Sequence, residues 1–218
     1  MVEMNRIPDV PSFNRPVEIP IPDIPVPAAQ VIRRLGYPAG HEIEPGIRRM
    51  IDTEIEASES LFRFRGIAVL LQIQTRDDRT LTFRNSSFTI QSSQVSAMLR
   101  GSDRAALFMV TIGPALEGRV KELLDSEEPT RAFILDAAGS ETSDAAADYV
   151  HRTVLSEIAS RDGRTVTPRF SPGYGDWDLC VQPDLLRACR GDRIGISVTR
   201  SCLMLPRKSV SAVLGLAP

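Results

Sequence analysis

The chain is poor in the residues that most often hold metals or form covalent cross-links. Its 218 residues include three cysteines and two histidines. Cys180, Cys189 and Cys202 are odd in number and lack CxxC spacing, which argues against a disulfide framework, an iron–sulfur cluster or a structural zinc site. We expect these thiols to be free and buried. His151 falls late in a long predicted helix and is expected to be a hydrogen-bonded structural residue, so no metal site is predicted.

The sequence also lacks a dominant charge and a long apolar segment. Its 26 basic and 28 acidic residues give a formal net charge of -2, so there is no broad basic field to attract nucleic acid. The apolar run at residues 105–112 is far too short to span a membrane. The first residues, MVEMNRIPDVP, are acidic and broken by proline, unlike a signal peptide. We therefore expect a cytoplasmic protein that binds neither nucleic acid nor membrane.

Prolines are concentrated near the start of the chain. Seven of the 16 prolines fall between residues 8 and 27, where they forbid a helix and remove backbone donors. We expect residues 1–27 to form an extended arm, whose apolar side chains favour packing on the rest of the chain over free disorder. Residues 28–218 are numerous enough for one core and are predicted to form a single domain.

Apolar spacing after the arm predicts an uneven mixture of helices and strands. A hairpin with its turn at residues 76–79 makes the start of the sheet antiparallel. Because helices and strands do not alternate regularly, the predicted class is α+β, an antiparallel sheet with flanking helices. The predicted helices cover residues 28–35, 45–58, 93–100, 114–124, 130–160 and 183–189, and the predicted strands cover residues 66–74, 81–84, 107–112, 193–199 and 208–214.

The longest predicted helix, residues 130–160, carries two patterns. Alanines at 137, 138, 145, 146 and 147 leave room for the close approach of another element. Asp136, Ser140, Asp144 and Asp148 recur every four residues and so form a polar stripe along one side. A stripe of acids on a helix is usually a solvated face, and that interpretation stays open beside a functional one.

The loop RFSPGYGDWDL, residues 169–179, combines a cation, exposed backbone and aromatic rings. Arg169 can bind a carboxylate through two parallel hydrogen bonds. Pro172 bends the loop, while Gly173 and Gly175 allow the backbone to approach a planar ligand without a Cβ in the way. The loop can therefore hold a small zwitterion. A plain surface turn with a solvated Arg169 is the alternative.

A second segment, SCLMLPRKSVSAVLGL at residues 201–216, adds to this pattern. Its Ser-x-x-Met-x-Pro-x-x-Ser-Val-Ser and the loop's Arg-x-x-x-Gly-Tyr together resemble the reactivation domain of cobalamin-dependent methionine synthase, most closely in its free-standing versions. A weaker match is the acidic-Tyr-x-His segment at residues 148–151, with Asp144 where that family tends to carry a glutamate. The specific motifs span residues 136–216. The resemblance implies a twisted antiparallel sheet with flanking helices.

The resemblance implies that the chain binds S-adenosylmethionine. Arg169 would bind the carboxylate of the methionine moiety, and Gly173 and Tyr174 would line the adenosine and methionyl portions. Asp144 would face the α-ammonium or sulfonium group, where a carboxylate gains Coulomb energy from a bound cation. The predicted cofactor-binding residues are Arg169, Pro172, Gly173, Tyr174, Gly175, Asp144, Met204, Pro206 and Ser209.

Two groups of residues beside these carry less specific expectations. Met204, Pro206 and Ser209 would border the ligand groove or the face presented to the corrinoid. A bend between two strands, with Met204 in the core, is the alternative. Asp176 and Trp177 follow the Arg-x-x-x-Gly-Tyr motif and could form a ligand wall or a docking surface.

By the same resemblance the chain is an activation subunit in methionine biosynthesis. It would support reductive methylation of cob(II)alamin on a partner methionine synthase or related corrinoid protein, with the electron supplied by a donor such as a flavodoxin or ferredoxin. The sulfonium methyl is already activated, so the domain would act by positioning, and no catalytic residue is predicted. The chain has no Asp-x-His-x-x-Gly, the signature of cobalamin carriers, so the cobalamin would belong to the partner.

Other functions are weighed against this one. The glycine pattern GxGxxG is missing, which disfavours a Rossmann-type methyltransferase. A non-catalytic accessory protein that docks on a corrinoid methyltransferase with a degenerate ligand site stays open as an alternative. The sequence therefore does not decide whether the chain takes part in methyl transfer or only in docking.

Overall fold

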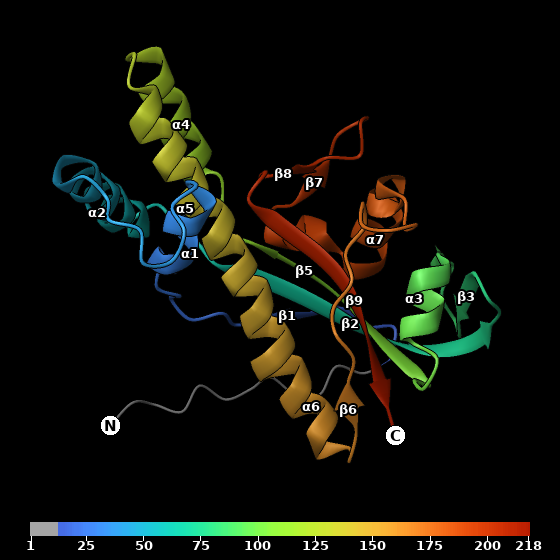
Figure 1. Cartoon of the computed structure of the whole chain (residues 1–218). Coiled ribbons are helices and arrows are strands. Elements are labelled where there is room, and N and C mark those ends of the chain that lie inside the picture. The colour runs from blue at the N-terminus through green and yellow to red at the C-terminus, as the bar shows by residue number, and fades with distance from the viewer. Residues whose placement is uncertain (1–12) are drawn as a thin grey trace.

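An antiparallel sheet with flanking helices forms the centre of the computed structural model, which describes residues 13–218 (Figure 1). The strand order is β4-β3-β2-β5-β9-β6, and β1 pairs with β2 beside β3. Every pair of strands is antiparallel, which confirms the predicted α+β class. The strands are β1 (Val17–Ile19), β2 (Arg65–Arg76), β3 (Thr80–Phe83), β4 (Thr89–Gln91), β5 (Arg104–Thr111), β6 (Thr165–Val166) and β9 (Ser209–Ala217), and a separate pair is formed by β7 (Ser197–Val198) and β8 (Met204–Leu205).

The helices lie where apolar spacing predicts them. The long helix predicted at residues 130–160 is continuous to Arg161, but its α-helical pattern is interrupted by one π-helical segment, Val150–Leu155. The helices are α1 (Ala28–Arg34), α2 (Pro45–Glu59), α3 (Ser93–Met98), α4 (Ala115–Asp125), α5 (Pro129–Tyr149), α6 (Ser156–Arg161) and α7 (Gln182–Cys189), with short 3₁₀ turns at Leu179–Val181 and Gly191–Ile194.

The two faces of the sheet are covered by different helices. Alternate residues of the central strands point to opposite faces. Leu107, Met109 and Val213 pack on one face with α3 and α7, whereas Phe108, Ala212 and Leu214 pack on the other with α5 and α6. Figure 1 shows the long α5–α6 rod crossing one side of the sheet and α7 and α3 lying on the other. The sheet edge at β9 therefore lies between two helical layers.

The alanines of α5 allow the close packing that the sequence predicts. Ala137 and Ala138 pack against α4 in a helical cluster, and Ala146 and Ala147 pack on the sheet. A Cβ on Gly139 would lie 2.8 Å from the Leu116 side chain of α4, so this position has no room for one. Close contact of α5 with both the sheet and α4 fixes the line along which its polar stripe runs.

Three sequence-based assignments need correction. The strand predicted at residues 193–199 is mostly a turn, and only Ser197–Val198 pairs, with β8 rather than with the main sheet. Ile194 and Ile196 are both buried, so the alternation typical of a strand arises from a turn whose two isoleucines reach the same core. β5 begins at Arg104 instead of 107, and the short strands β4, β6 and β8 have no counterpart among the predicted strands.

The apolar spacing of residues 45–58 predicts a buried stripe of Ile47, Met50, Ile51, Ile55 and Ser58, and the structure confirms it only in part. Ile51 and Ser58 are buried, but Ile47, Met50 and Ile55 are half-buried. Glu54, which the apolar pattern does not select, is 2% exposed. Its carboxylate accepts a hydrogen bond of 2.5 Å from Arg131 Nε on α5. An ion pair with a buried carboxylate and a half-buried guanidinium therefore joins α2 to α5, at a position that the apolar pattern does not select.

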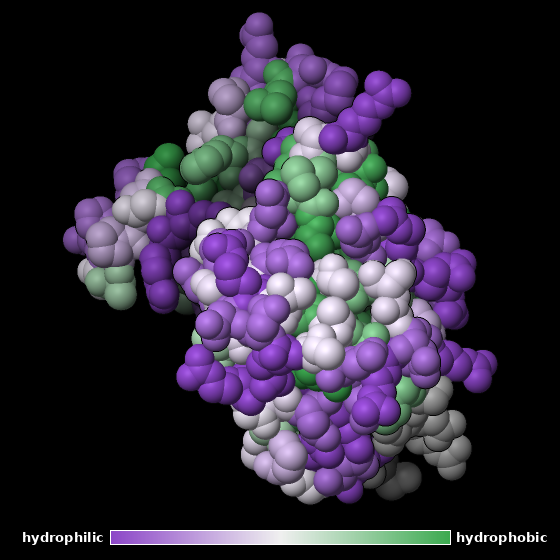
Figure 2. All heavy atoms as spheres, turned by 90° about the vertical axis from the view of Figure 1, so that its right-hand side faces the viewer, coloured by the Kyte–Doolittle hydropathy of each residue, from purple (hydrophilic) through white to green (hydrophobic). Residues whose placement is uncertain are grey.

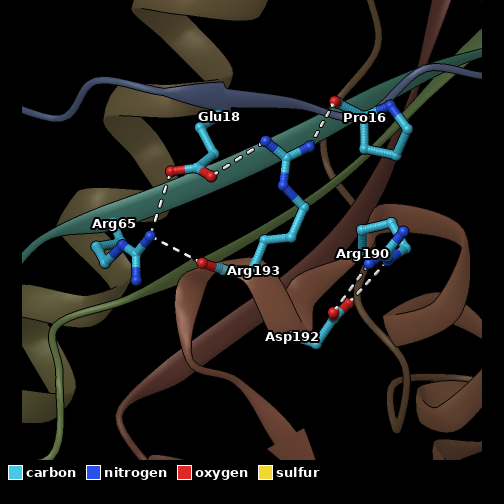
Figure 3. Close-up of polar contacts among 6 residues, drawn as sticks. All are labelled: Pro16, Glu18, Arg65, Arg190, Asp192 and Arg193. Atoms are coloured by element: carbon cyan, nitrogen blue, oxygen red, sulfur yellow. Dashed lines mark hydrogen bonds and ion pairs between the residues drawn. The ribbon is translucent and has the colours of Figure 1, made fainter.

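The described part of the predicted arm is extended and lies against the sheet. Residues 1–12 of that arm lie outside the described residues. Glu18 of β1 accepts hydrogen bonds from Arg65 of β2, at 3.2 Å, and from Arg193, at 3.3 Å (Figure 3). Arg193 also donates to the Pro16 carbonyl at 3.3 Å. Beside them Arg190 pairs with Asp192 through two contacts. These ion pairs tie the arm to the turn that follows α7.

No helix within residues 13–218 is long and apolar enough to cross a membrane.

Candidate functional site

A cavity of about 540 Å³ opens at the edge of β9, between α5 and the start of α7. It brings together segments that are far apart in the sequence: the polar stripe of α5, the loop at residues 169–174, β8 and the first residues of β9. Six of the nine predicted binding residues line it, namely Asp144, Arg169, Pro172, Tyr174, Met204 and Ser209. Gly173, Gly175 and Pro206 are not part of its wall. The two segments singled out by their motifs therefore face one space.

Arg169 lies between two carboxylates of α5. Its Nη2 donates to Asp144 Oδ1 at 2.5 Å, and its Nε donates to Asp148 Oδ1 at 3.2 Å. The side chain is 20% exposed. Burial lowers the pKa of this guanidinium, but the hydrogen bonds and charges of Asp144 and Asp148 outweigh that effect and raise it above its ordinary value. Arg169 is therefore a fixed, permanently charged group in the cavity wall.

This pairing leaves donors and an acceptor for a ligand. A guanidinium has five N–H groups, of which Asp144 and Asp148 take one each. The three that remain, on Nη1 and Nη2, form a planar fork that fits a carboxylate. Asp144 is 57% exposed and binds Arg169 through Oδ1 only, so its Oδ2 can accept from a cationic group. Arg152 is 76% exposed and reaches Asp148 only at 3.9 Å.

The polar stripe of α5 is paired along its whole length. Lys208, just before β9, lies 2.7 Å from Asp136 Oδ1 and donates to Ser140 Oγ at 2.8 Å. Asp144 and Asp148 bind Arg169 one turn further on. The three carboxylates remain about half exposed, at 52%, 57% and 43%, so the stripe is a solvated face that also pairs with two cations from distant segments. These contacts hold both motif segments against the same helix.

The glycines of the loop serve its own conformation. Gly173 and Gly175 have positive φ angles of 89° and 55°, which glycine adopts without strain. The Gly173 N–H donates to the Trp177 carbonyl at 2.8 Å. A Cβ on Gly175 would lie 2.0 Å from Gln94 Oε1. Tyr174, between them, is 70% exposed at the cavity. The two glycines therefore shape the loop that presents Tyr174.

Asp176 and Trp177 have structural roles, which corrects the expectation of a ligand wall or docking surface. Asp176 accepts hydrogen bonds from the Ser92 hydroxyl at 2.5 Å, from both N–H and Oγ of Ser93 at 2.7 Å, and from the Gln94 N–H at 3.3 Å. The hydroxyls of Ser92 and Ser93 are the main reason that the pKa of Asp176 falls far below its ordinary value. Trp177 is 2% exposed and packs in the core against Phe170. Asp176 therefore fastens the loop to the start of α3.

The second motif contributes one wall of the cavity. Met204 lines it and also packs against the core beneath α7, as the alternative interpretation of this residue predicts. Ser209 lines it as well, and its hydroxyl donates to the Pro206 carbonyl at 2.7 Å. Pro206 therefore shapes the turn that orients Ser209.

Sequence reasoning missed several residues of the wall. Ser211 is 2% exposed, and its hydroxyl donates to Gln182 Oε1 at 3.0 Å. Ser211 ends the Ser-Val-Ser motif, so the motif itself could have indicated it. Gln182 begins α7 and carries no signal in the sequence, because its role depends on facing β9. The residues not predicted are Phe170, Ser171, Leu179, Gln182, Val210 and Ser211.

The two histidines and three cysteines are not part of the cavity wall. His151 Nε2 lies 3.0 Å from the Thr167 carbonyl, which confirms the predicted structural histidine with a proton on Nε2. All three thiols are free, but only Cys189 and Cys202 are buried, whereas Cys180 is exposed. Within residues 13–218 no group of three or more His, Cys, Asp or Glu side chains is placed to hold a metal ion.

Exposed apolar side chains occur in the cavity wall, at Tyr174, and on either side of Met204 in the sequence. Tyr174 is 70% exposed, Leu203 between β7 and β8 is 53% exposed, and Leu205 of β8 is 42% exposed. Figure 2 shows the face on the right-hand side of Figure 1, where hydrophilic residues predominate and hydrophobic residues come to the surface between them.

Comparison with known proteins places the fold. No protein-family model matches the chain, and no curated protein matches it significantly. Among solved structures, the chain is similar to the crystal structure of the MetH reactivation domain bound to AdoHcy, with a TM-score of 0.70, 14% sequence identity, and coverage of 95% of this chain and 80% of that chain. The chain has the fold of that domain. The reactivation-domain fold therefore accounts for the antiparallel sheet and its flanking helices.

Proposed function

We propose that the cavity at the edge of β9 binds S-adenosylmethionine and its demethylated product. The observation that carries this proposal is the meeting of Arg169 and Asp144 in one cavity wall with both motif segments. A cation and an anion at hydrogen-bond distance match the two charged ends of an α-amino acid. The structure that shares this fold contains AdoHcy, which supports a ligand of the same class.

The methionyl tail fits the polar end of the cavity. Its carboxylate would accept from the free fork of Arg169, and its α-ammonium group would donate to Asp144 Oδ2. Charge-assisted hydrogen bonds of this kind are the strong ones in proteins. Because Arg169 is held by two carboxylates, its guanidinium is oriented before the ligand binds, which reduces the entropy lost on binding. The remaining wall, with Leu179, Met204 and Tyr174, offers apolar surface to the nucleoside.

In this proposal the chain positions a methyl donor for a corrinoid carried by a partner protein. Reductive methylation of cob(II)alamin needs the sulfonium methyl held in line with the metal and shielded from water, which is a matter of placement. The chain's own residues would bind and orient the donor and supply no acid, base or electron. Tyr174, Leu203 and Leu205 would contact the partner beside the cavity. The partner is a methionine synthase or a related corrinoid protein, and the electron comes from a separate donor.

Calorimetry with S-adenosylmethionine tests the binding step. We expect micromolar binding to the wild type and a loss of about 100-fold or more in Arg169→Ala, since two charge-assisted hydrogen bonds are removed. Arg169→Lys keeps the charge without the planar fork and should also bind weakly. Arg164→Ala is the matched control, because Arg164 makes a similar two-contact pair with Asp103 away from the cavity. Equal binding by Arg169→Ala and Arg164→Ala would refute the site.

One observation favours the second candidate, a docking protein with a degenerate ligand site. Asp144 and Asp148 already satisfy two N–H groups of Arg169, so this arginine has a structural partner without any ligand. If the wild type gives no heat with either S-adenosylmethionine or AdoHcy but still binds a corrinoid methyltransferase in a pull-down, the docking function is supported instead.

A further inference from the structure

The cavity begins where the hydrogen-bond ladder of β9 stops. On its inner side β9 pairs with β5 in continuous register from Ser209 to Leu216. On its outer side it pairs with Thr165 and Val166 of β6, and then through Phe170, whose N–H and C=O both bond to Val213 at 2.9 Å. Beyond Phe170 the chain diverges from β9 into the loop that forms the opposite wall. The cavity is therefore the gap left where an outer strand has separated from β9.

Alternation along β9 decides which residue faces this gap. The Lys208 carbonyl accepts a hydrogen bond from the Ile112 N–H, just after β5, so Lys208 directs its C=O inward, toward β5. Val213 points its N–H and C=O outward, to Phe170. Successive residues of a strand alternate in this respect, and the register has no bulge between these points. Ser211 therefore directs its N–H and its C=O outward, into the cavity.

These two backbone groups of Ser211 have no partner among residues 13–218. No other backbone or side chain there hydrogen-bonds to them, although Ser211 is only 2% exposed. Buried backbone groups are almost always paired, by protein, water or ligand. Directly behind them the Ser211 hydroxyl holds the carboxamide of Gln182, which is 3% exposed and also lines the cavity. A fixed donor and a fixed acceptor thus stand side by side in the deep wall.

We infer that the N–H and C=O of Ser211 on the open edge of β9, together with the neighbouring Gln182, form hydrogen bonds with the edge of an adenine base that carries the amino group. This inference rests on the proposed function and specifies which end of the ligand binds there. On that edge of adenine a ring nitrogen accepts and the neighbouring amino group donates, which complements the N–H and C=O of Ser211. The base takes the place of the missing strand residue, and Gln182 supplies a further hydrogen bond beside it.

The arrangement selects adenine over a 6-oxo purine. A main-chain donor and acceptor cannot exchange places, whereas a side-chain amide can turn over. In hypoxanthine the same edge has a ring N–H and a carbonyl, so donor meets donor and acceptor meets acceptor. Turning the base over would correct the order but would move the sugar away from the tail held by Arg169. Loss of two hydrogen bonds predicts about 100-fold weaker binding of the 6-oxo analogue.

Two measurements on the full chain test this inference. Hydrogen exchange followed by NMR should show the Ser211 amide proton slowed by roughly tenfold or more when AdoHcy saturates the protein, as expected for a newly made hydrogen bond. Calorimetry should show S-inosylhomocysteine, in which oxygen replaces the 6-amino group, binding about 100-fold more weakly than AdoHcy. If AdoHcy binds but the Ser211 amide is unaffected or the two ligands bind equally, the inference fails and the proposed function stands. If neither ligand binds, both fail.

The variant Gln182→Leu measures how much the Gln182 side chain contributes to affinity beside the main-chain groups of Ser211. It should weaken AdoHcy binding by about tenfold, because one hydrogen bond to the base is lost. Gln74→Leu is the matched control, an exposed glutamine of β2 that is not in the cavity wall, and should bind as the wild type does. Thermal unfolding checks that Gln182→Leu is folded, and an undiminished affinity in the folded variant would remove Gln182 from the proposal.

Discussion

Replacing Asp144 with Asn should weaken binding of S-adenosylmethionine more than binding of AdoHcy. The two ligands share the adenosine and the amino-acid tail and differ at sulfur, which is a cationic sulfonium in the first and a neutral thioether in the second. Any effect of Asp144 on Arg169 or on the ammonium group acts on both ligands alike. The ratio of their dissociation constants therefore isolates the attraction between Asp144 and the sulfonium charge.

The size of this effect follows from the exposure of Asp144. A unit charge about 5 Å from a carboxylate contributes about 1 kcal/mol at the dielectric constant of water and about 3 kcal/mol at an effective value of 20. Because the Asp144 side chain is 57% exposed, the lower figure applies. The dissociation constant of S-adenosylmethionine should therefore rise about fivefold relative to that of AdoHcy in Asp144→Asn. The difference should shrink toward zero at about 1 M salt, where screening acts over about 3 Å.

Calorimetry with both ligands, at low and at high salt, makes this measurement. Asp136→Asn is the control, since Asp136 lies on the same stripe of α5 but pairs with Lys208 and is not in the wall of this cavity. It should leave the ratio unchanged. An unchanged ratio in Asp144→Asn as well, or a change that is insensitive to salt, would refute the placement of the sulfonium beside Asp144.

Three further predictions concern the loop and the thiols. Gly175→Ala should lower the free energy of unfolding in urea by about 1 kcal/mol, because its φ is positive, whereas Gly101→Ala, with open space around it, should not. The folded pKa of Asp176 lies far below its unfolded value near 3.8, so Asp176 stabilises the fold above that pH and the contribution is lost as pH falls toward the folded pKa. The difference in stability between wild type and Asp176→Asn should therefore be constant near pH 7, begin to shrink near pH 4 and keep shrinking at lower pH, and a difference that does not change with pH would contradict this. The hydrogen bond and charge of Cys202 raise the pKa of the exposed Cys180 to about 11. Mass spectrometry should therefore show an alkylation rate that keeps rising up to about pH 11, and a rate that levels off just above pH 9, the ordinary thiol pKa, would contradict this.

Local patterns predicted the elements well because their causes are local. The hairpin β2–β3, the limits of α1 and α4, and the four-residue spacing on α5 depend on neighbours within one or two turns of chain. The strand predicted at residues 193–199 failed for a physical reason: Ile194 and Ile196 reach the same core from a turn, and alternation alone cannot distinguish this from a strand.

The sequence predicts only those residues of the candidate site that lie in its motifs. Arg169 and Asp144 were both selected, but their mutual hydrogen bond spans 25 positions, and no local pattern shows that they meet. Asp176 lies two residues after the Arg-x-x-x-Gly-Tyr motif and yet binds Ser92, which is 84 positions away, so its closeness to the motif suggests the wrong role. Gln182 escaped notice because only the folded sheet brings it to Ser211.

The pairing of the arm with β2 bears on the solubility of the protein. Residues 17–19 pair with residues 66–68, and the Asn14 N–H donates to the Leu70 carbonyl at 2.9 Å, so this stretch occupies the outer groups of β2. A chain trimmed to start at residue 28 would leave that row of amides and carbonyls bare, and bare strand edges are templates for self-association. The proline-rich segment thus covers this edge of β2, and its prolines, which cannot donate, disfavour pairing with a further strand.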